Sequence, residues 1–448
     1  MTPAGTTADA ADAVAAEPGP PPLARNREYN LLWTANVVSQ LGAQGTLIAY
    51  PLLVLGLGGS AFEASLAEFA IAGSRALAAL PAGALADRVS RKALMLVSEL
   101  GRAVALGLLA LLVALGHAPL AVILVVAVVE GVCTSLFGTA DQALLPGVVP
   151  ASQLADAVTR NTARYYLATI VGPGIGGFLY GVQRLLPFLT QAVTSALAFV
   201  TLLFLRPPAP RPAADGADAG GGDAADGPGE GPGEGPQEST LQAMAAGLRW
   251  LRGNRPVRAT VLLGTAFNLV FSGLLITVVV MAQQDGRSGA EIGAIGALIG
   301  AGGVLGALSA GVLRRSLTPF TALMVLTWAS AALVPLLAVV PTGWPAGLVL
   351  GAAAFLAPTA TALVAGHQMM VTPDAMRGRL AGLIGVSMGA AAALGPLLSG
   401  LLLETVHGVP TVLSCAAAFL LIALGVAATP AVRAFPALPD DRGHPPGS

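Results

Sequence analysis

The segment Gly83-Ala-Leu-Ala-Asp-Arg-Val-Ser-Arg-Lys92 lies between two long apolar stretches, residues 65–86 and 93–115. Four of its ten residues are charged, in a chain that is 55% hydrophobic and only 10% charged. An ordinary soluble domain is about 25% charged, so this chain lacks the residues for a soluble surface. The segment is therefore predicted to be a short loop between two helices that cross a membrane.

Apolar runs of this kind occur twelve times, and each has the length of about 20 residues that crosses roughly 30 Å of hydrocarbon. Within these runs, apolar and polar residues do not alternate as they do in the strands of a membrane barrel. Each run must therefore form a helix, in which the backbone groups hydrogen-bond to one another. The sequence predicts an all-α integral membrane protein with 12 transmembrane helices at residues 31–57, 65–86, 93–115, 119–140, 163–182, 185–205, 259–281, 292–313, 320–340, 346–366, 380–403 and 409–428.

The distribution of Lys and Arg predicts the orientation, because basic residues near span ends stay on the cytoplasmic side. With the N-terminus inside, 19 of the 23 basic residues fall in cytoplasmic segments, and the outer loops hold only Arg184 and Arg287. Both termini of this multi-pass membrane protein are therefore predicted to be cytoplasmic. Segment 207–238, with seven Pro, nine Gly and seven Asp or Glu, is predicted to be disordered.

This linker divides the predicted chain into two bundles of six helices. The expected divisions are a disordered tail at 1–24, a bundle at 25–206, a cytoplasmic linker at 207–256, a second bundle at 257–430 and a tail at 431–448. A shift of 223 residues carries Gly172-Pro173 onto Gly395-Pro396, Glu68 onto Glu291, and segment 83–92 onto 306–315. Duplicated halves are typical of secondary transporters, whose binding site lies between the halves.

Several other classes are not favoured by the sequence. A net charge of −1 gives no basic surface for nucleic acid. Cys133 and Cys415 lie inside apolar runs, so neither a disulfide nor a metal is predicted. The sequence holds no pattern of nucleophile and base, and no nucleotide-binding loop, so neither an enzyme nor a cofactor is predicted.

Segment 83–92 resembles the signature between spans two and three of the major facilitator superfamily, with Ser90 in place of a glycine. This resemblance implies two pseudo-symmetric six-helix bundles and a monomeric transporter that works by alternating access. It also implies a conformational latch, formed by Gly83, Asp87, Arg88, Arg91 and Lys92, for which Asp141 is the expected partner. The simpler interpretation makes these charges topology anchors only.

A second resemblance lies in span five, where Ala168-x-x-x-Gly172-Pro173-x-x-Gly176-Gly177 is similar to a helix-packing element of drug/proton antiporters. Span eleven repeats it around Gly395 and Pro396. With the run Leu-Leu-Pro-Gly-Val-Val-Pro at 144–150, the chain resembles the subgroup of enterobactin and macrolide exporters. The implied function is export of a small organic molecule, such as a drug, siderophore or natural product, by proton antiport. The resemblance also implies that the protein lies in the lipid of a bacterial inner membrane. Uptake by symport and a non-transporting scaffold or receptor are the alternatives.

Charged residues within spans predict internal pairs or ion pathways. Arg75 and Glu130 both fall about 15 to 16 Å deep by helical rise, so they are expected to pair or to relay a proton together. Glu99 and Arg102 are one helical turn apart and are expected to form a structural pair. Glu68 and Glu291 lie near the outer surface and are expected to snorkel or to cap helices.

Polar residues also recur on one face of two spans. Asn36, Gln40 and Gln44 draw a stripe along span one, and Asn268 and Ser272 do likewise in span seven. Lipid disfavours such a stripe, whereas a bundle interior accepts it. Because the resemblance places both spans around a central cavity, these five residues are expected to contact the cargo or to bond neighbouring helices.

Overall fold

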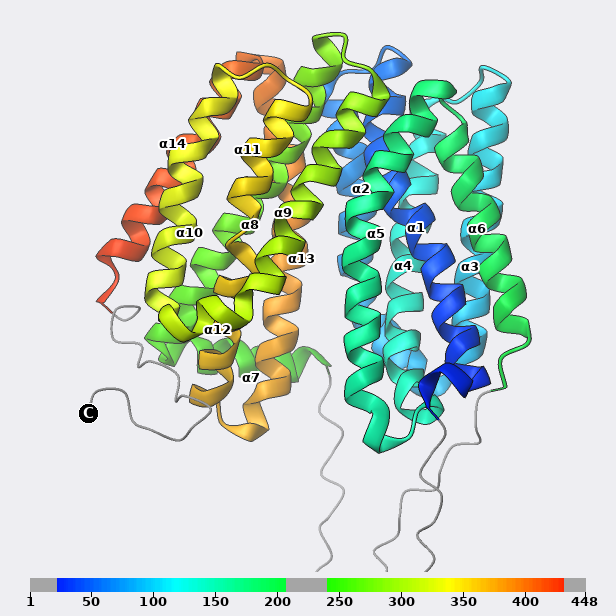
Figure 1. Cartoon of the computed structure of the whole chain (residues 1–448), viewed down its shortest axis with the longest axis horizontal. Helices are drawn as coiled ribbons and strands as arrows, with labels where there is room; N and C mark the ends of the chain where they lie inside the picture. Colours follow the sequence, from blue (N-terminus) through cyan, green and yellow to red (C-terminus); the bar gives the residue numbers. More distant parts are fainter. Residues whose placement is uncertain (1–21, 207–239, 431–448) are drawn as a thin grey trace, which may run out of the picture.

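The computed structural model describes residues 22–206 and 240–430, apart from the side chains of residues 80, 87, 240–244 and 375. The described chain is helical, without strands, and its long helices stand side by side in two groups (Figure 1). The first group holds α1 (Arg27–Gly56), α2 (Ala61–Arg88), α3 (Arg91–Ala114), α4 (Leu120–Val148), α5 (Leu154–Val182) and α6 (Leu186–Leu203). The second holds α8 (Arg255–Gln284), α9 (Gly289–Ser316), α10 (Pro319–Leu333), α11 (Trp344–Ala354), α12 (Ala357–Val371), α13 (Asp374–Val406) and α14 (Gly408–Ala428).

Twelve crossings result, and the predicted all-α membrane fold is confirmed. Ten of the described elements are long and apolar enough to span a membrane, counting α10 with the following 3-10 turn (Val334–Ala338) as one and α11 with α12 as another. The remaining two, α2 and α5, are 28 and 29 residues long but are less apolar. Their charged and small residues serve contacts inside the molecule that are described below.

The tenth crossing is broken rather than continuous. Pro358 lies in the first turn of α12 and has no backbone N–H to donate to the carbonyl of Ala354, where α11 ends. The single predicted span at 346–366 therefore becomes two helices, and α12 reaches Val371.

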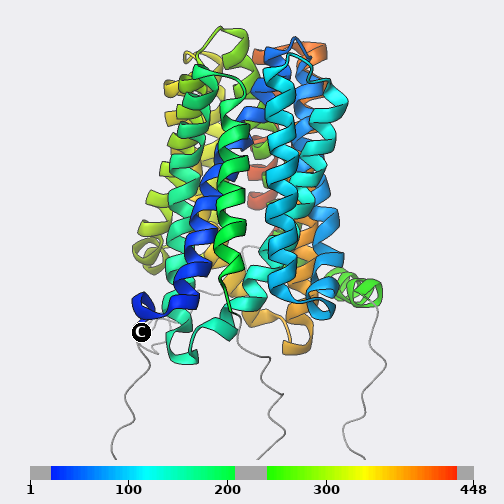
Figure 2. The same ribbon diagram turned by 90° about the vertical axis from the view of Figure 1, so that its right-hand side faces the viewer.

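The predicted linker contains an additional helix, α7 (Thr240–Gly253), which lies across one end of the second group (Figures 1 and 2). Leu251 anchors it by packing against Val257, Val261 and Leu380. The predicted tails and the segment 207–238 lie outside the described residues, apart from a short 3-10 turn at Leu23–Arg25.

Helix caps give the true correspondence of the two halves. Asn26 caps α1 and Asn254 caps α8, each by accepting a hydrogen bond from the third residue after it. Ser60 and Glu63 form a capping box on α2, and Ser288 and Glu291 form the same box on α9. The second member of each pair follows the first by 228 residues, not 223.

The predicted offset is therefore wrong for these helices by five residues, whereas 223 relates Gly172 to Gly395 in α5 and α13. Glu291 corresponds to Glu63, and Glu68 corresponds to Gly296. The counterpart of the latch segment begins at Gly311, not Gly306.

The two halves meet along a seam in which α2 packs against α13 and α5 packs against α9. The contact is tight near the loops at 57–60 and 285–288, which we call the closed end. There, Gly177 lies against Gly289 and Gly293, and in the equivalent pair Gly400 lies against Ala61 and Ser65. A small apolar core of Ala61, Ile276, Val280 and Leu403 joins both halves at this end.

Contact across the seam ends about halfway along the helices, where Ala76 faces Gly389 and Thr169 faces Gly300. Beyond this level, there is open space where a side chain would extend from Gly83, Gly311, Gly378, Gly382 or Gly385. The end that carries the turns at 89–90 and 372–373 is therefore the open end, at the bottom of Figure 1.

Candidate functional site

Three ionisable side chains meet inside the first half, on α3 and α4. The Arg102 Nη1 atom lies 3.0 Å from Glu99 Oε1, and Arg102 Nε lies 3.8 Å from Glu130 Oε1. Glu99, Arg102 and Glu130 are 0%, 4% and 6% exposed, so both carboxylates and the guanidinium are shielded from solvent. The predicted Glu99–Arg102 pair is present, and Glu130 has joined it.

Neutral polar groups from three helices, α1, α4 and α6, complete this cluster. Ser39 donates to Glu99 Oε1 at 2.8 Å, Gln191 Nε2 donates to Glu130 Oε1 at 2.7 Å, and Arg102 Nη2 donates to Thr134 Oγ1 at 2.8 Å. Thr46 in turn donates to Gln191. Phe137 places its ring 5.7 Å from the guanidinium carbon, a cation–π contact.

The predicted pair between Arg75 and Glu130 is not formed. Their depths match, but a shared depth does not fix the direction in which a helix points its side chains. Glu130 faces α3 and α6, whereas Arg75 is exposed on α2, seven residues after Glu68 and therefore on the same helix face. That face borders the seam between the halves, because Glu68 lines a pocket there.

The polar stripe of α1 divides between two sides of the helix. Asn36 is buried and its Nδ2 donates to Asp141 Oδ1 at 2.9 Å, inside the first half. Gln44 Nε2 donates to Thr169 Oγ1 at 2.9 Å and borders the seam. Gln40 is partly exposed between them. Two of the three predicted cargo contacts thus form bonds between helices, the alternative that the sequence left open.

A pocket of about 180 Å³ lies in the seam near the closed end. Its apolar walls come from both halves: Leu47 and Ile48 of α1, Leu275 and Val279 of α8, and Ile295 and Ile299 of α9. The polar residues that line it are Gln44, Glu68 and Thr169.

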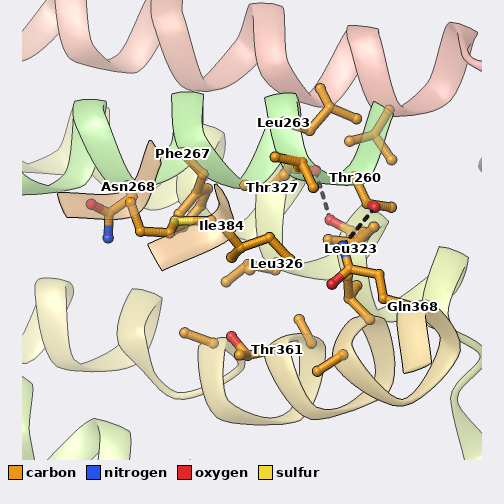
Figure 3. A pocket seen from close by; sticks show the side chains of 18 of the residues that line it. Thr260, Leu263, Phe267, Asn268, Leu323, Leu326, Thr327, Thr361, Gln368 and Ile384 are labelled. Atoms are coloured by element: carbon orange, nitrogen blue, oxygen red, sulfur yellow. Dashed lines mark hydrogen bonds between the residues drawn. The ribbon is translucent and has the colours of Figure 1, made fainter. Parts of the chain in front are cut away.

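A larger pocket of about 670 Å³ occupies the second half (Figure 3). It is lined by α8, α10, α12 and α13 and extends from Phe271 to Thr372 and Arg377 at the open end. The rings of Phe267 and Phe271 are stacked, with centroids 6.0 Å apart. The wall is mostly apolar.

Few polar groups reach the large pocket. Gln368 Nε2 donates to Thr260 Oγ1 at 2.9 Å, and Thr327 of α10 and Thr361 of α12 also line the pocket (Figure 3). Asn268, predicted as a cargo contact, lines the pocket, and its buried Oδ1 has no hydrogen-bond partner within the described chain. Ser272 instead donates to the carbonyl of Ala391 at 3.3 Å, so it joins α8 to α13.

The small residues of α5 pack against two different helices, α1 and α9. A side chain at Gly172 or Gly176 would collide with Gln44 or Gly45 of α1, so these glycines set the contact inside the first half. Pro173 and Gly177 face α9 across the seam. Gly395 packs against Leu269 and Gly273 of α8, and Pro396 lies beside it within α13.

The predicted latch residues gather at the open end, and the hydrogen bonds described for Arg91 and Lys92 stay within the first half. Arg91 Nη1 donates to the Ala143 carbonyl at 2.6 Å, and Lys92 Nζ donates to the Leu203 and Leu205 carbonyls at 2.8 and 2.7 Å. These hydrogen bonds give donors to backbone carbonyls near the C-terminal ends of α4 and α6. Arg88 is exposed, Gly83 faces open space, and the side chain of Asp87 lies outside the described residues. Asp141 bonds Asn36 rather than a latch arginine.

Several site residues escaped the sequence interpretation. Ser39, Thr46 and Gln191 were not singled out, although Gln191 is an isolated amide in an otherwise apolar span, which is a usable signal. Thr260, Thr327 and Gln368 form no periodic polar pattern in the sequence. For Gln368, the break at Pro358 also decides which side of the tenth crossing faces the pocket. Among the described residues, no three His, Cys, Asp or Glu side chains are close enough to hold a metal.

Known proteins with similar sequences are exporters. The family model of the Major Facilitator Superfamily matches residues 32–369. Enterobactin exporter EntS of Shigella boydii is 27% identical over 365 residues, which cover 79% of this chain and 80% of that protein. EntS of Escherichia coli gives the same identity and coverage.

Solved structures show the same fold at low sequence identity. The nucleoside transporter NupG is 13% identical with a TM-score of 0.67, over 90% of this chain and 98% of that one. An inward-facing, unoccupied bacterial homologue of the human lysosomal transporter Spinster is 13% identical with a TM-score of 0.67, over 92% and 98%. With its helices, its duplicated halves and the match over most of its length, the chain belongs to the major facilitator superfamily.

Proposed function

We propose that this transporter exports a small, mostly apolar organic molecule from the cytoplasm in exchange for protons. The observation that carries the proposal is the shape of the seam: the halves touch at the closed end and separate toward the open end, which an apolar pocket of about 670 Å³ reaches. Such an arrangement is one of two states that a rocking motion of the halves interconverts.

The open end is assigned to the cytoplasm. It carries Arg88, Arg91, Lys92, Arg314, Arg315 and Arg377, whereas the closed-end loops carry Arg184 and Arg287. Basic residues concentrate on the cytoplasmic side of a membrane protein. In this state the pocket is therefore loaded from the cytoplasm, as an exporter requires, and the curated relatives are exporters by name.

The pocket limits the chemistry of the cargo. Its volume falls in the range of about 300 to 1,000 Å³ that holds drug-sized ligands. The stacked rings of Phe267 and Phe271 suit a flat apolar body, and the unpartnered amide oxygen of Asn268 offers one hydrogen-bond acceptor for orientation.

The buried cluster of Glu99, Arg102 and Glu130 is assigned to proton coupling. Two ionised carboxylates would leave it with one uncompensated negative charge away from water, which is costly. The Oε2 atoms of Glu99 and Glu130 have no hydrogen-bond partner in the described structure. A single proton shared by the two carboxyls makes the cluster neutral, and exchange of that proton changes the charge inside the first half.

The test uses everted membrane vesicles with an imposed acid-inside pH gradient and a panel of labelled apolar compounds. Wild type is expected to accumulate at least one compound, and accumulation should cease when the gradient is collapsed. Asn268→Leu should raise the apparent KM about 10-fold, the order of one lost polar contact to a ligand. The control is Thr277→Val, because Thr277 bonds its own helix and does not line the pocket.

Different outcomes reject different parts of the proposal. Movement of compounds only in the opposite direction would indicate uptake by symport, and no movement of any compound would indicate a scaffold. Full gradient-driven transport by Glu130→Gln would mean that the cluster is structural and that coupling lies elsewhere.

A further inference from the structure

Glu68 is a carboxylate for which the fold gives no structural reason. It was expected to cap a helix or to snorkel, but the box on α2 is made by Glu63, whose Oε2 accepts from the Ser60 backbone N–H at 2.8 Å. Glu68 lies five residues farther along the helix, partly buried, and lines the seam pocket. No hydrogen bond or ion pair to Glu68 occurs among the described residues.

The groups around Glu68 supply no compensating positive charge. The pocket walls from α1, α5, α8 and α9 hold the neutral polar groups Gln44 and Thr169 and otherwise apolar residues. The α13 residues that contact α2 along this face include Gly389, Ala393 and Gly400, none of which is charged. Glu404 lies at the closed-end mouth, where it accepts from the Phe62 N–H at 3.3 Å. On the face of α2 that carries Glu68, the nearest cation is Arg75, about 10 Å along the helix axis.

The position also distinguishes the two halves. The counterpart of Glu68 in the second half is Gly296, which packs on Pro173. A carboxylate at one of two equivalent sites is not required for helix packing, because the other site packs without it. Glu68 instead places one ionisable carboxyl group where both halves meet, in a space that alternating access would open and close.

The seam pocket adjoins the large pocket along α8. Phe271 lines the large pocket and Leu275, one turn later, lines the seam pocket. A cation that occupies the large pocket next to Phe271 therefore lies about one helical turn along α8 from the seam pocket that Glu68 lines. An unpaired carboxylate among apolar groups binds a cation more strongly than a carboxylate in water does.

We propose that Glu68 binds a cationic group of the cargo, so that the substrates are amphiphilic organic cations, and that protonation of the same carboxyl releases them. This inference rests on the proposed export function and adds the substrate class. The proton goes to a Glu68 oxygen, the cation leaves, and no bond of the cargo changes.

The test measures binding to purified protein in lipid nanodiscs, with tetraphenylphosphonium as the cationic probe and triphenylphosphine oxide as the uncharged one. Glu68→Gln is expected to weaken tetraphenylphosphonium binding about 10- to 100-fold, the range for a contact to a charged group. Binding of the uncharged probe should change by less than about 2-fold, which also shows that the variant is folded. Glu68→Asp should retain part of the affinity for the cation.

The matched control is Glu63→Gln, on the same helix, where glutamine still completes the capping box. It should bind both probes as wild type does. Lowering the pH from 8 to 5.5 should weaken cation binding in wild type and in Glu63→Gln, but not in Glu68→Gln.

Unchanged tetraphenylphosphonium affinity in Glu68→Gln, or the absence of binding to wild type, would overturn the inference. Export of uncharged compounds in the vesicle assay would then still support the proposed function. Conversely, Glu68-dependent cation binding without any transport would support this site and reject the export proposal.

Discussion

Arg102 holds two carboxylates at a place where water has almost no access. It bonds Glu99 and Thr134, and its Nε lies near Glu130. Breaking a buried charge pair by removing one partner leaves the other charge without compensation, and this costs more than the pair itself contributes. The three members of the cluster therefore differ in how well the fold tolerates their loss.

Arg102→Met is predicted to destabilise the protein by about 3 to 5 kcal/mol, the usual cost of leaving a charge buried and unpaired. Glu130→Gln should cost about 1 kcal/mol or less, because Gln191 can bond the new amide and the Glu99–Arg102 pair is then neutral. Thermal unfolding in detergent, followed by the fluorescence of a thiol-reactive dye at the two buried cysteines, measures both. Equal melting temperatures for the two variants would contradict this account.

The pairing of Glu130 could not be predicted from the sequence. Helical rise gives the depth of a residue, and by that measure Arg75 was a suitable partner. The direction in which a side chain leaves its helix depends on which neighbours the helix packs against. Here Ser74, not Arg75, faces Gly131 of α4. The i,i+3 spacing of Glu99 and Arg102 needs no such knowledge, and that pair was predicted correctly.

At the level of elements, close helix contacts depend on the lack of side chains at a few positions. Gly177 allows α5 to touch Gly289 and Gly293 of α9, and Gly400 allows α13 to touch α2 in the same way. The sequence predicted these residues as packing devices but not that one face serves α1 and the other serves the seam. That distinction is set by the tertiary arrangement.

Gly177→Ala is predicted to hold the closed end apart, because the added Cβ would meet the Gly289 carbonyl and the Gly293 backbone, which cannot yield as a side chain can. Overpacking of this kind costs about 1 to 3 kcal/mol, so the population should shift toward states open at this end. The reporter is a cysteine at Ile295, which is 2% exposed in the seam pocket, with Cys133 and Cys415 replaced by alanine. Its alkylation by a soluble maleimide should accelerate about 10-fold.

Gly181→Ala is the control, since its Cβ would lie 3.7 Å from the nearest atom of α9, an ordinary contact. It should leave the alkylation rate unchanged. Equal rates in Gly177→Ala and wild type would mean that the α5–α9 contact does not govern closure.

Among the described side chains of helix α7, at residues 245–253, the buried one is that of Leu251, which attaches the helix to the second half. Leu251 is 6% exposed and packs against α8 and α13, whereas Leu248 is 40% exposed. Leu251→Ala should weaken this attachment by about 2 to 5 kcal/mol, the usual cost of such a truncation in a core, and trypsin should cleave faster after Arg249 and Arg252. Leu248→Ala should be cleaved as slowly as wild type, and equal cleavage of both variants would contradict the assignment.

Over the whole molecule, composition and run length were sufficient to predict the helical membrane fold, because the bilayer leaves few alternatives. The repeat was found but misaligned by five residues in its first helices, since matching glycines are less specific than capping boxes. The conformation, closed at one end and open at the other, could not be predicted, because apolar runs do not specify which helix ends touch. The large pocket likewise depends on the break at Pro358 and on the state that is adopted.

The two halves touch at one end only. Alternating access requires that these contacts be exchanged for contacts at the other end. Electron–electron distance measurements in lipid nanodiscs test this directly. One pair of spin labels replaces Val158 and Val312 on the open-end parts of α5 and α9, and a second pair replaces Val182 and Gln284 near the closed end, in a chain without Cys133 and Cys415. All four label sites are exposed.

When tetraphenylphosphonium is added or the pH is changed, the open-end distance should shorten in part of the molecules while the closed-end distance lengthens in the same proportion. Two distances that remain fixed under every condition, or that lengthen together, would contradict alternating access in this protein.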